Sequence, residues 1–215
     1  VAAVSDNDPG LVMPLGTGTA DVHAVYKGVL SSRFGSQATF ELGLVCVSPA
    51  GSDITGDGTR ANPYRSIPHG IAQAEIHGAS SVLVADDLYL YAAPVVLRPG
   101  ISLYGGYDPV TWERNCDLFG TTVRNSQTTG GTYGSPNAAF AASDPTITPE
   151  NTKIDGFLIQ GGTGDHCAGI YLENGASPTI RKCEIWANTG ARSWGGIRDY
   201  RSRQQLRHRQ QYRVP

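Results

Sequence analysis

Charged residues are scarce in this chain of 215 residues, and lysine is the scarcest of them. Asp, Glu, Lys and Arg together make up 17% of the sequence, and only three residues are Lys. A helical protein would use more Lys, Glu and Leu, so the composition argues against an all-α fold. Glycine, by contrast, occurs 27 times and proline 13 times. We therefore expect an all-β, turn-rich chain that is long enough for one substantial core.

Several patterns that would identify a protein class are absent. No apolar run reaches 18 residues, so we expect no membrane-spanning segment. The chain shows neither an initiator Met nor a signal peptide, which we interpret as typical of a processed product and compatible with export. The motifs GxSxG, HExxH, GxxxxGK[ST] and a complete EF-hand loop do not occur. These signatures therefore give no guide to the chemistry.

The four cysteines lack the spacing of a metal or redox motif. No CxxC pair occurs, so we expect neither a zinc ribbon nor a thioredoxin-like site. Cysteine is also a small apolar residue that cores accept. We therefore expect most of the four to be buried, with one disulfide at most. They are Cys46, Cys116, Cys167 and Cys183.

The net charge of −2 conceals two regions of opposite sign. Residues 198–215 carry six Arg and one Asp, whereas residues 1–197 carry 11 basic and 18 acidic side chains. The larger region is acidic and would repel phosphates. We therefore expect no nucleic-acid partner.

Two stretches near the C-terminus repeat each other at a spacing of 26 residues. Residues 153–162 and 179–188 align so that apolar side chains coincide at three positions. The next segments, 167–170 and 194–197, match at a spacing of 27. Short strand-like repeats of this length indicate a solenoid, in which each coil buries its apolar face against the next. The coinciding pairs are Ile154 with Ile180, Phe157 with Cys183, and Ile159 with Ile185.

The order of elements along the chain fits such a solenoid. Between residues 80 and 197, short apolar segments alternate with Gly, Pro, Asn and Asp, which predicts roughly four to five coils of parallel strands. Residues 66–77 predict a short helix, with Ser66 as N-cap and Gly78 as its stop, that covers the open end of the solenoid. We expect strands or a cap in residues 1–44, and a long loop over residues 125–151.

Five segments occur in a characteristic order: 47–53 (VSPAGSD), 58–67 (GTRANPYRSI), 100–109 (GISLYGGYDP), 154–157 (IDGF) and 177–180 (SPTI). Together they resemble the N-terminal half of the right-handed parallel β-helix proteins of the pectate-lyase-like superfamily, in particular exported bacterial members. The resemblance covers residues 45–197. It implies a right-handed parallel β-helix with a secreted or cell-surface location and a polysaccharide partner. That superfamily includes lyases, hydrolases, esterases and surface proteins, so the fold does not decide the activity.

The first candidate site lies on adjacent coils of the repeat. The alternation of strand side chains points Asp155 and Arg181 outward and within contact distance of each other. In lyases of the superfamily, a basic residue abstracts a proton next to a uronic carboxylate, which Ca²⁺ or Arg neutralises. The resemblance gives such roles to Lys153, Arg181 or Lys182. The alternative is a solvated ion pair between coils.

The second candidate site is the turn that contains Asp165 and His166. A His beside carboxylates can act as a general base, and with the hydroxyl of Ser193 it would support ester hydrolysis. The alternative is a polar turn without a chemical role.

The third candidate is a metal site in the Gly-rich turn before the predicted helix. Asp53, Asp57 and Asn62 carry the oxygen ligands that Ca²⁺ prefers. The alternative is that these side chains cap the turn and dock the helix.

The tail, residues 198–215, breaks the pattern where another coil should follow. Read one base later, under one permitted choice of codons, it becomes rich in Ala, Ser and Asn. We interpret this as a shifted reading frame that ends the solenoid early; a basic amphipathic helix is the alternative. An uncapped last coil would pair with another copy, so we expect a homo-oligomer.

Three classes of function stay open. The first is a lyase or glycoside hydrolase that acts on polysaccharide. The second is an ester hydrolase, and the third is a glycan-binding or surface module without catalysis.

Overall fold

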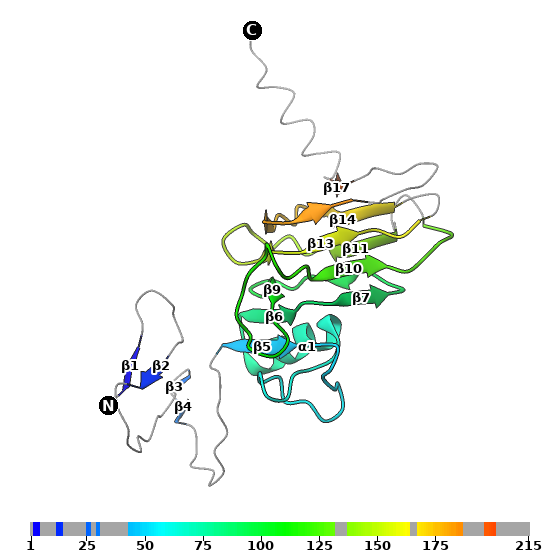
Figure 1. Cartoon of the computed structure of the whole chain (residues 1–215). Helices are drawn as coiled ribbons and strands as arrows, with labels where there is room; N and C mark the ends of the chain where they lie inside the picture. Colours follow the sequence, from blue (N-terminus) through cyan, green and yellow to red (C-terminus); the bar gives the residue numbers. More distant parts are fainter. Residues whose placement is uncertain are drawn as a thin grey trace. The chain divides into compact units, whose positions relative to one another are not determined.

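The computed structural model describes most of the chain beyond residue 42 and four short strands before it (Figure 1). The chain divides into two units, Val1–Gly43 and Leu44–Pro215. Within the described part, none of the helical structure has the length and apolar character that crossing a bilayer requires. The described residues are 2–4, 12–14, 25–26, 29–30, 43–131, 137–163, 167–186 and 196–200.

The described residues of the first unit form two antiparallel strand pairs. Strand β1 (Ala2–Val4) pairs with β2 (Val12–Pro14), and β3 (Val25–Tyr26) pairs with β4 (Val29–Leu30). Two residues separate β3 from β4, the spacing of a tight hairpin.

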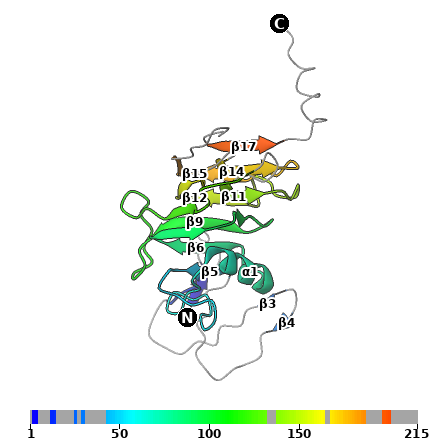
Figure 2. The same ribbon diagram turned by 90° about the vertical axis from the view of Figure 1, so that its right-hand side faces the viewer.

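The second unit consists of parallel strands in three sheets and one helix (Figures 1 and 2). Sheet I contains β5 (Leu44–Val47), β6 (Ser81–Ala85), β9 (Ser102–Tyr107), β12 (Lys153–Asp155) and β15 (Thr179–Arg181). Sheet II contains β7 (Leu88–Tyr91), β10 (Thr122–Asn125), β13 (Leu158–Gln160) and β16 (Glu184–Ile185). Sheet III contains β8 (Val95–Val96), β11 (Asn137–Ala142), β14 (Cys167–Glu173) and β17 (Ile197–Tyr200).

The chain passes through sheets I, II and III in that order four times. The four rounds are β6–β8, β9–β11, β12–β14 and β15–β17, and paired strands of successive rounds are parallel. The expectation of an all-β chain of parallel strands is therefore confirmed. The strand β17 continues to Tyr200, three residues into the stretch that the charge pattern separates as a tail, and residues 201–215 lie outside the described part.

The sequence repeat coincides with the register of the strands. Ile154 pairs with Ile180 in sheet I, Ile159 with Ile185 in sheet II, and Ile170 with Ile197 in sheet III. Ile154, Ile159 and Ile170 are fully buried in the main core. The sequence repeat therefore corresponds to one row of stacked apolar side chains in each sheet.

The long loop predicted over residues 125–151 is wrong, because β11 lies inside it. This strand pairs with β8 on one side and β14 on the other. Its sequence is rich in Ala, which has a low preference for strands, and this composition concealed it. Phe140 is its one large apolar side chain, fully buried with its ring 5.6 Å from that of Phe157.

The predicted helix is confirmed as α1 (Ile67–His77). The Ser66 side chain accepts a hydrogen bond from the His69 amide, and Gly78 ends the helix in the left-handed conformation at φ 68°. Ile67, Ile71 and Ala74 are buried, and α1 lies at the β5 end of the stacked strands (Figure 1). The helix thus covers that end of the core.

Within the described part of the chain, Cys46, Cys116 and Cys183 form no disulfide bond. Cys46 is buried, whereas Cys116 and Cys183 are half-buried. Cys167 is described only as part of the strand β14.

Candidate functional site

The corner between sheets I and II differs from one round to the next. Residues 86–87, 156–157 and 182–183 turn this corner in the first, third and fourth rounds, but the second round uses residues 108–121. Asp108 starts this longer loop by accepting hydrogen bonds from the Val110 and Thr111 amides, at 2.8 and 2.7 Å. A bridge between Tyr107 and Arg114 folds the loop back against β9.

The 108–121 loop covers the outer face of sheet I with a second, smaller core. Cys46, Leu83 and Ala85 point away from the main core and are buried together with Trp112 of the loop. The Trp112 indole also donates a hydrogen bond to the Arg60 carbonyl, at 3.1 Å. Outward residues of sheet I are therefore not all in contact with water.

Asp155 lies on this covered face and is only 1% exposed. Arg114 Nη2 donates to its Oδ1 at 2.7 Å, and Arg181 Nη2 lies 2.9 Å from its Oδ2. The predicted contact between Asp155 and Arg181 is confirmed. The alternative, a solvated ion pair, is wrong for the Asp155 carboxylate, because the 108–121 loop and Arg114 exclude water from it.

The two arginines contact Asp155 in different ways. Arg181 is close enough for an ion pair but lacks hydrogen-bond geometry, so Oδ2 has no hydrogen-bond donor within the described ranges. Burial is the largest single effect on Arg114 and opposes its charge, but the hydrogen bond to Asp155 and the electrostatic attraction of Cys116, Asp155 and Tyr107 together outweigh burial and raise the pKa of the guanidinium. Arg114 also donates from Nε to the Gly105 carbonyl and lies over the rings of Tyr104 and Tyr107.

Glycine is required where the third round passes beneath the loop. Gly156 has φ 82°, a conformation that L side chains rarely adopt. A Cβ atom at this position would stand 2.6 Å from Arg114 Nη2 and 2.8 Å from Cys116 Sγ. The close approach of loop and strand therefore depends on the missing side chain.

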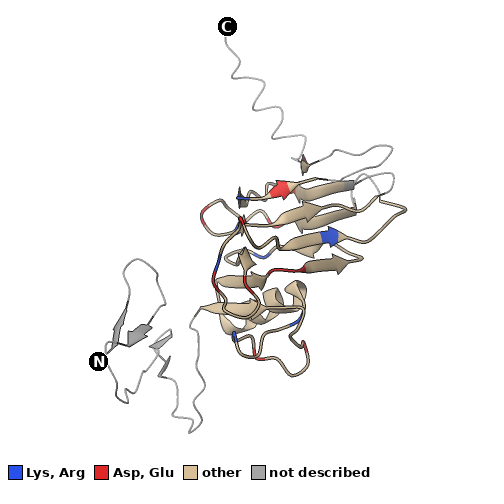
Figure 3. Ribbon diagram, viewed as in Figure 1, with Lys and Arg blue, Asp and Glu red and all other residues tan. Residues whose placement is uncertain are grey.

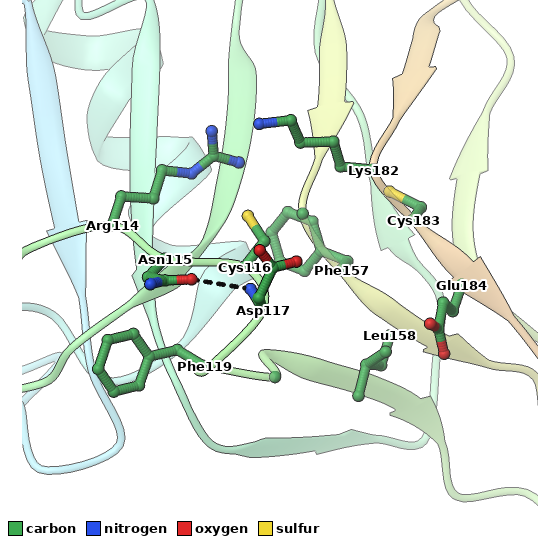
Figure 4. A pocket seen from close by; sticks show the side chains of 12 residues that line it. Arg114, Asn115, Cys116, Asp117, Phe119, Phe157, Leu158, Lys182, Cys183 and Glu184 are labelled. Atoms are coloured by element: carbon green, nitrogen blue, oxygen red, sulfur yellow. Dashed lines mark hydrogen bonds between the residues drawn. The ribbon is translucent and has the colours of Figure 1, made fainter.

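An open cleft of about 690 Å³ lies between the 108–121 loop and the next two rounds. At one end of it, the side chains of Arg114 and Lys182 point toward each other (Figure 4). Exposed Asp117 and Glu184 belong to opposite sides, the loop and β16. The other lining residues are Asn115, Cys116, Phe119, Gly120, Gly156, Phe157, Leu158 and Cys183.

Lys182 is held in an unusual backbone conformation beside the cleft. The φ angle of Lys182 is 47°. Because Asp155 pairs with Arg181, the next residues, Gly156 and Lys182, occupy equivalent positions in successive rounds. The left-handed region costs a non-glycine residue about 1–2 kcal/mol. Among the described residues, no hydrogen bond or ion pair engages the ammonium group. Residues with strained backbone often cluster at functional sites.

The structure thus brings together Asp155, Arg181 and Lys182, three of the predicted site residues. Asp165 and His166 lie outside the described residues, as does Ser193. The sequence reasoning did not find Arg114 or Asp117. The signal that could have found them is the length of the 108–121 loop.

The predicted calcium ligands take part in turn bonds. Asp53 Oδ1 accepts from the Arg65 and Ser66 amides at 2.8 and 3.0 Å, which connects the turn to the start of α1. Asp57 Oδ1 accepts from the amide and hydroxyl of Thr59, and Asn62 Nδ2 donates to the Thr55 carbonyl. The capping alternative therefore describes these contacts. In the described ranges no three His, Cys, Asp or Glu residues form a metal-binding group, and calcium stays a prediction.

Charged side chains occur mainly in loops and at corners rather than along the strands (Figure 3). Fold and site together define an all-β protein of parallel strands with a charged cleft at one corner. Comparison of the chain with protein-family models, curated proteins and solved structures found no match.

Proposed function

We propose that this chain is an exported right-handed parallel β-helix that acts as a lyase on acidic polysaccharide, with its active site in the corner cleft. The repeated order of sheets I, II and III supports the β-helix. The single observation that carries the function is the pair of basic side chains, Arg114 and Lys182, that point toward each other there (Figure 4). If a uronic carboxylate lies between them, Arg114 would neutralise its charge, and the amine of Lys182 would lie on the other side.

The proposed reaction is a β-elimination. The amine of Lys182 acts as the general base and removes the proton from the carbon that bears the carboxylate. The electron pair of that C–H bond forms a double bond to the neighbouring ring carbon, and the glycosidic C–O bond breaks. The departing oxygen takes a proton from water, and the hydroxide so formed takes the proton back from Lys182. No oxidant or reductant is needed, and each cleavage leaves one unsaturated sugar end.

Arg114 has the geometry to bind the substrate carboxylate. Its Nε and Nη2 donate to Gly105 and Asp155, whereas Nη1 has no acceptor within the described ranges. The bonds to Asp155 fix the guanidinium plane, which lowers the entropy lost when a ligand binds. Asp155 is accordingly a positioning residue, and Arg181 supports it.

The test uses defined oligouronides and the ultraviolet absorbance of the unsaturated product. We expect product from the wild type, and a loss of activity of at least about 100-fold in Lys182→Ala, the scale of a missing general base. Lys153→Ala is the matched control, because Lys153 lies on β12 and does not line the cleft. Equal activity in Lys182→Ala and the wild type would remove the proposed base.

Glycoside hydrolysis is the second candidate, favoured by Asp117 and Glu184 on opposite sides of the cleft. Two carboxylates that flank a sugar can serve as acid and base or as nucleophile. Such an enzyme would release a saturated reducing end and lose activity in Asp117→Asn and Glu184→Gln.

Three other expectations stay predictions. The ester hydrolase rests on His166 and the hydroxyl of Ser193, both outside the described residues. A homo-oligomer formed by edge strands of the last round is untested, and so is glycan binding without turnover.

A further inference from the structure

The outer face of sheet II presents two straight rows of side chains. Tyr89, Val123 and Ile159 point into the core and are buried, so the residues on either side of each point outward. The register aligns Leu88, Thr122, Leu158 and Glu184 in one row. It aligns Leu90, Arg124, Gln160 and Trp186 in the other, which we call the outer row.

The outer row is exposed to solvent, whereas the 108–121 loop covers the outer face of sheet I. Leu90 is 50% and Trp186 53% exposed, and within the described residues Arg124 makes no ion pair. A half-exposed indole ring can stack on a ligand with its free face. The row therefore has the exposure of a binding surface.

The cleft borders this face, because two residues belong to both. Leu158 and Glu184 line the cleft and also form part of the first row, and Gln160 and Trp186 stand two residues further along the same strands. A linear ligand that leaves the cleft across sheet II crosses the outer row.

We propose that the outer row binds sugar units of a polysaccharide that extend beyond the cleft, an inference that rests on the proposed function. The Trp186 ring stacks on the apolar face of a sugar. The Gln160 amide and the Arg124 guanidinium are planar donors that hydrogen-bond hydroxyl and carboxylate groups. Neighbouring strands place these groups about 4.8 Å apart, so one chain can contact all three.

The test compares kcat/KM for oligouronides of increasing length in the wild type and in Trp186→Ala. We expect kcat/KM of the wild type to rise with substrate length. Trp186→Ala should lower kcat/KM about five- to tenfold, and for long substrates only. The shortest cleaved substrate should react equally in both proteins. Val96→Ala is the control, because Val96 is 46% exposed on the outer face of sheet III.

The outcomes separate the two proposals. If kcat/KM does not depend on length, or if Trp186→Ala lowers it equally at every length, the outer row is not a sugar-binding surface while the lyase stands. If no length yields product, the proposed function falls and this inference falls with it. If the wild type is dimeric and Trp186→Ala monomeric in light scattering, the face binds a second copy and the inference is overturned.

Discussion

Arg114 donates a hydrogen bond to Asp155 at 2.7 Å, although 41 residues separate the two in sequence. One residue belongs to the loop that turns the corner in the second round, and the other ends β12 in the third. This contact fixes the loop over sheet I and orients a cation at the edge of the cleft.

Removing one partner of this pair should destabilise the fold strongly. Arg114→Ala leaves the carboxylate of Asp155 buried with only the ion pair to Arg181, and such uncompensated burial costs about 3–5 kcal/mol. Urea denaturation measures the change in the free energy of unfolding. Arg124→Ala, on the exposed outer row, should change it by less than about 0.5 kcal/mol. A similar small loss in both variants would contradict a stabilising role for the Arg114–Asp155 contact.

Gly156 allows a separate test of the crowding beneath the loop. Gly156→Ala and Gly100→Ala place a Cβ on backbones with nearly equal φ, 82° and 79°. The strain should be about 1–2 kcal/mol in each. Only at residue 156 does the new atom meet Arg114 and Cys116, whereas at residue 100 it meets nothing within 4 Å. Thermal unfolding should show a larger loss for Gly156→Ala. Equal losses would mean that the loop moves away freely.

Lys182 should show a conflict between stability and activity. Lys182→Gly relieves the left-handed strain, worth about 1–2 kcal/mol, and loses about 1 kcal/mol to the greater freedom of the unfolded chain. We expect stability equal to the wild type or slightly higher, together with loss of lyase activity. Chemical denaturation and initial rates measure the two effects. Retention of full activity would show that the Lys182 amine is not the catalytic base.

Asp53 predicts a loss of stability in acid. Burial opposes its ionisation, but hydrogen bonds from Ser66 and Arg65 outweigh burial and lower the pKa of the carboxyl from its ordinary value of 3.8. The folded state thus binds the proton less tightly than the unfolded state. The contribution to stability is complete above pH 3.8 and decreases as the pH falls through the lowered value. The midpoint of urea unfolding, followed from neutral pH into acid, should fall less steeply in Asp53→Asn. Parallel curves would assign the acid loss to other carboxyls.

The sequence predicted the parts of the fold that depend on large apolar residues and on capping chemistry. Ile154 and Ile180 predicted their own pairing, and Ser66 and Gly78 predicted both ends of α1. The strand β11 was missed because alanines line most of it and do not mark strands.

The strand residues of the site could be predicted from the sequence, but the loop residue Arg114 could not. The alternation of strand residues found Asp155 and Arg181, since adjacent rounds bring equivalent positions together. Arg114 approaches from a loop whose path depends on a turn at Asp108 and on the burial of Trp112, and no periodicity encodes such a path. The burial of Asp155 follows from that loop, so the sequence pointed to a solvated pair instead.

Cleavage of oligouronides in water enriched in heavy oxygen, read by mass spectrometry, tests the proposed lyase most directly. Elimination at the corner cleft predicts fragments with one unsaturated end, lighter by one water than their saturated forms, and no heavy oxygen at the new ends. These fragments should vanish in Lys182→Ala and persist in Lys153→Ala. Saturated fragments with one heavy oxygen at each new reducing end, or unsaturated fragments of undiminished yield from Lys182→Ala, would contradict the account.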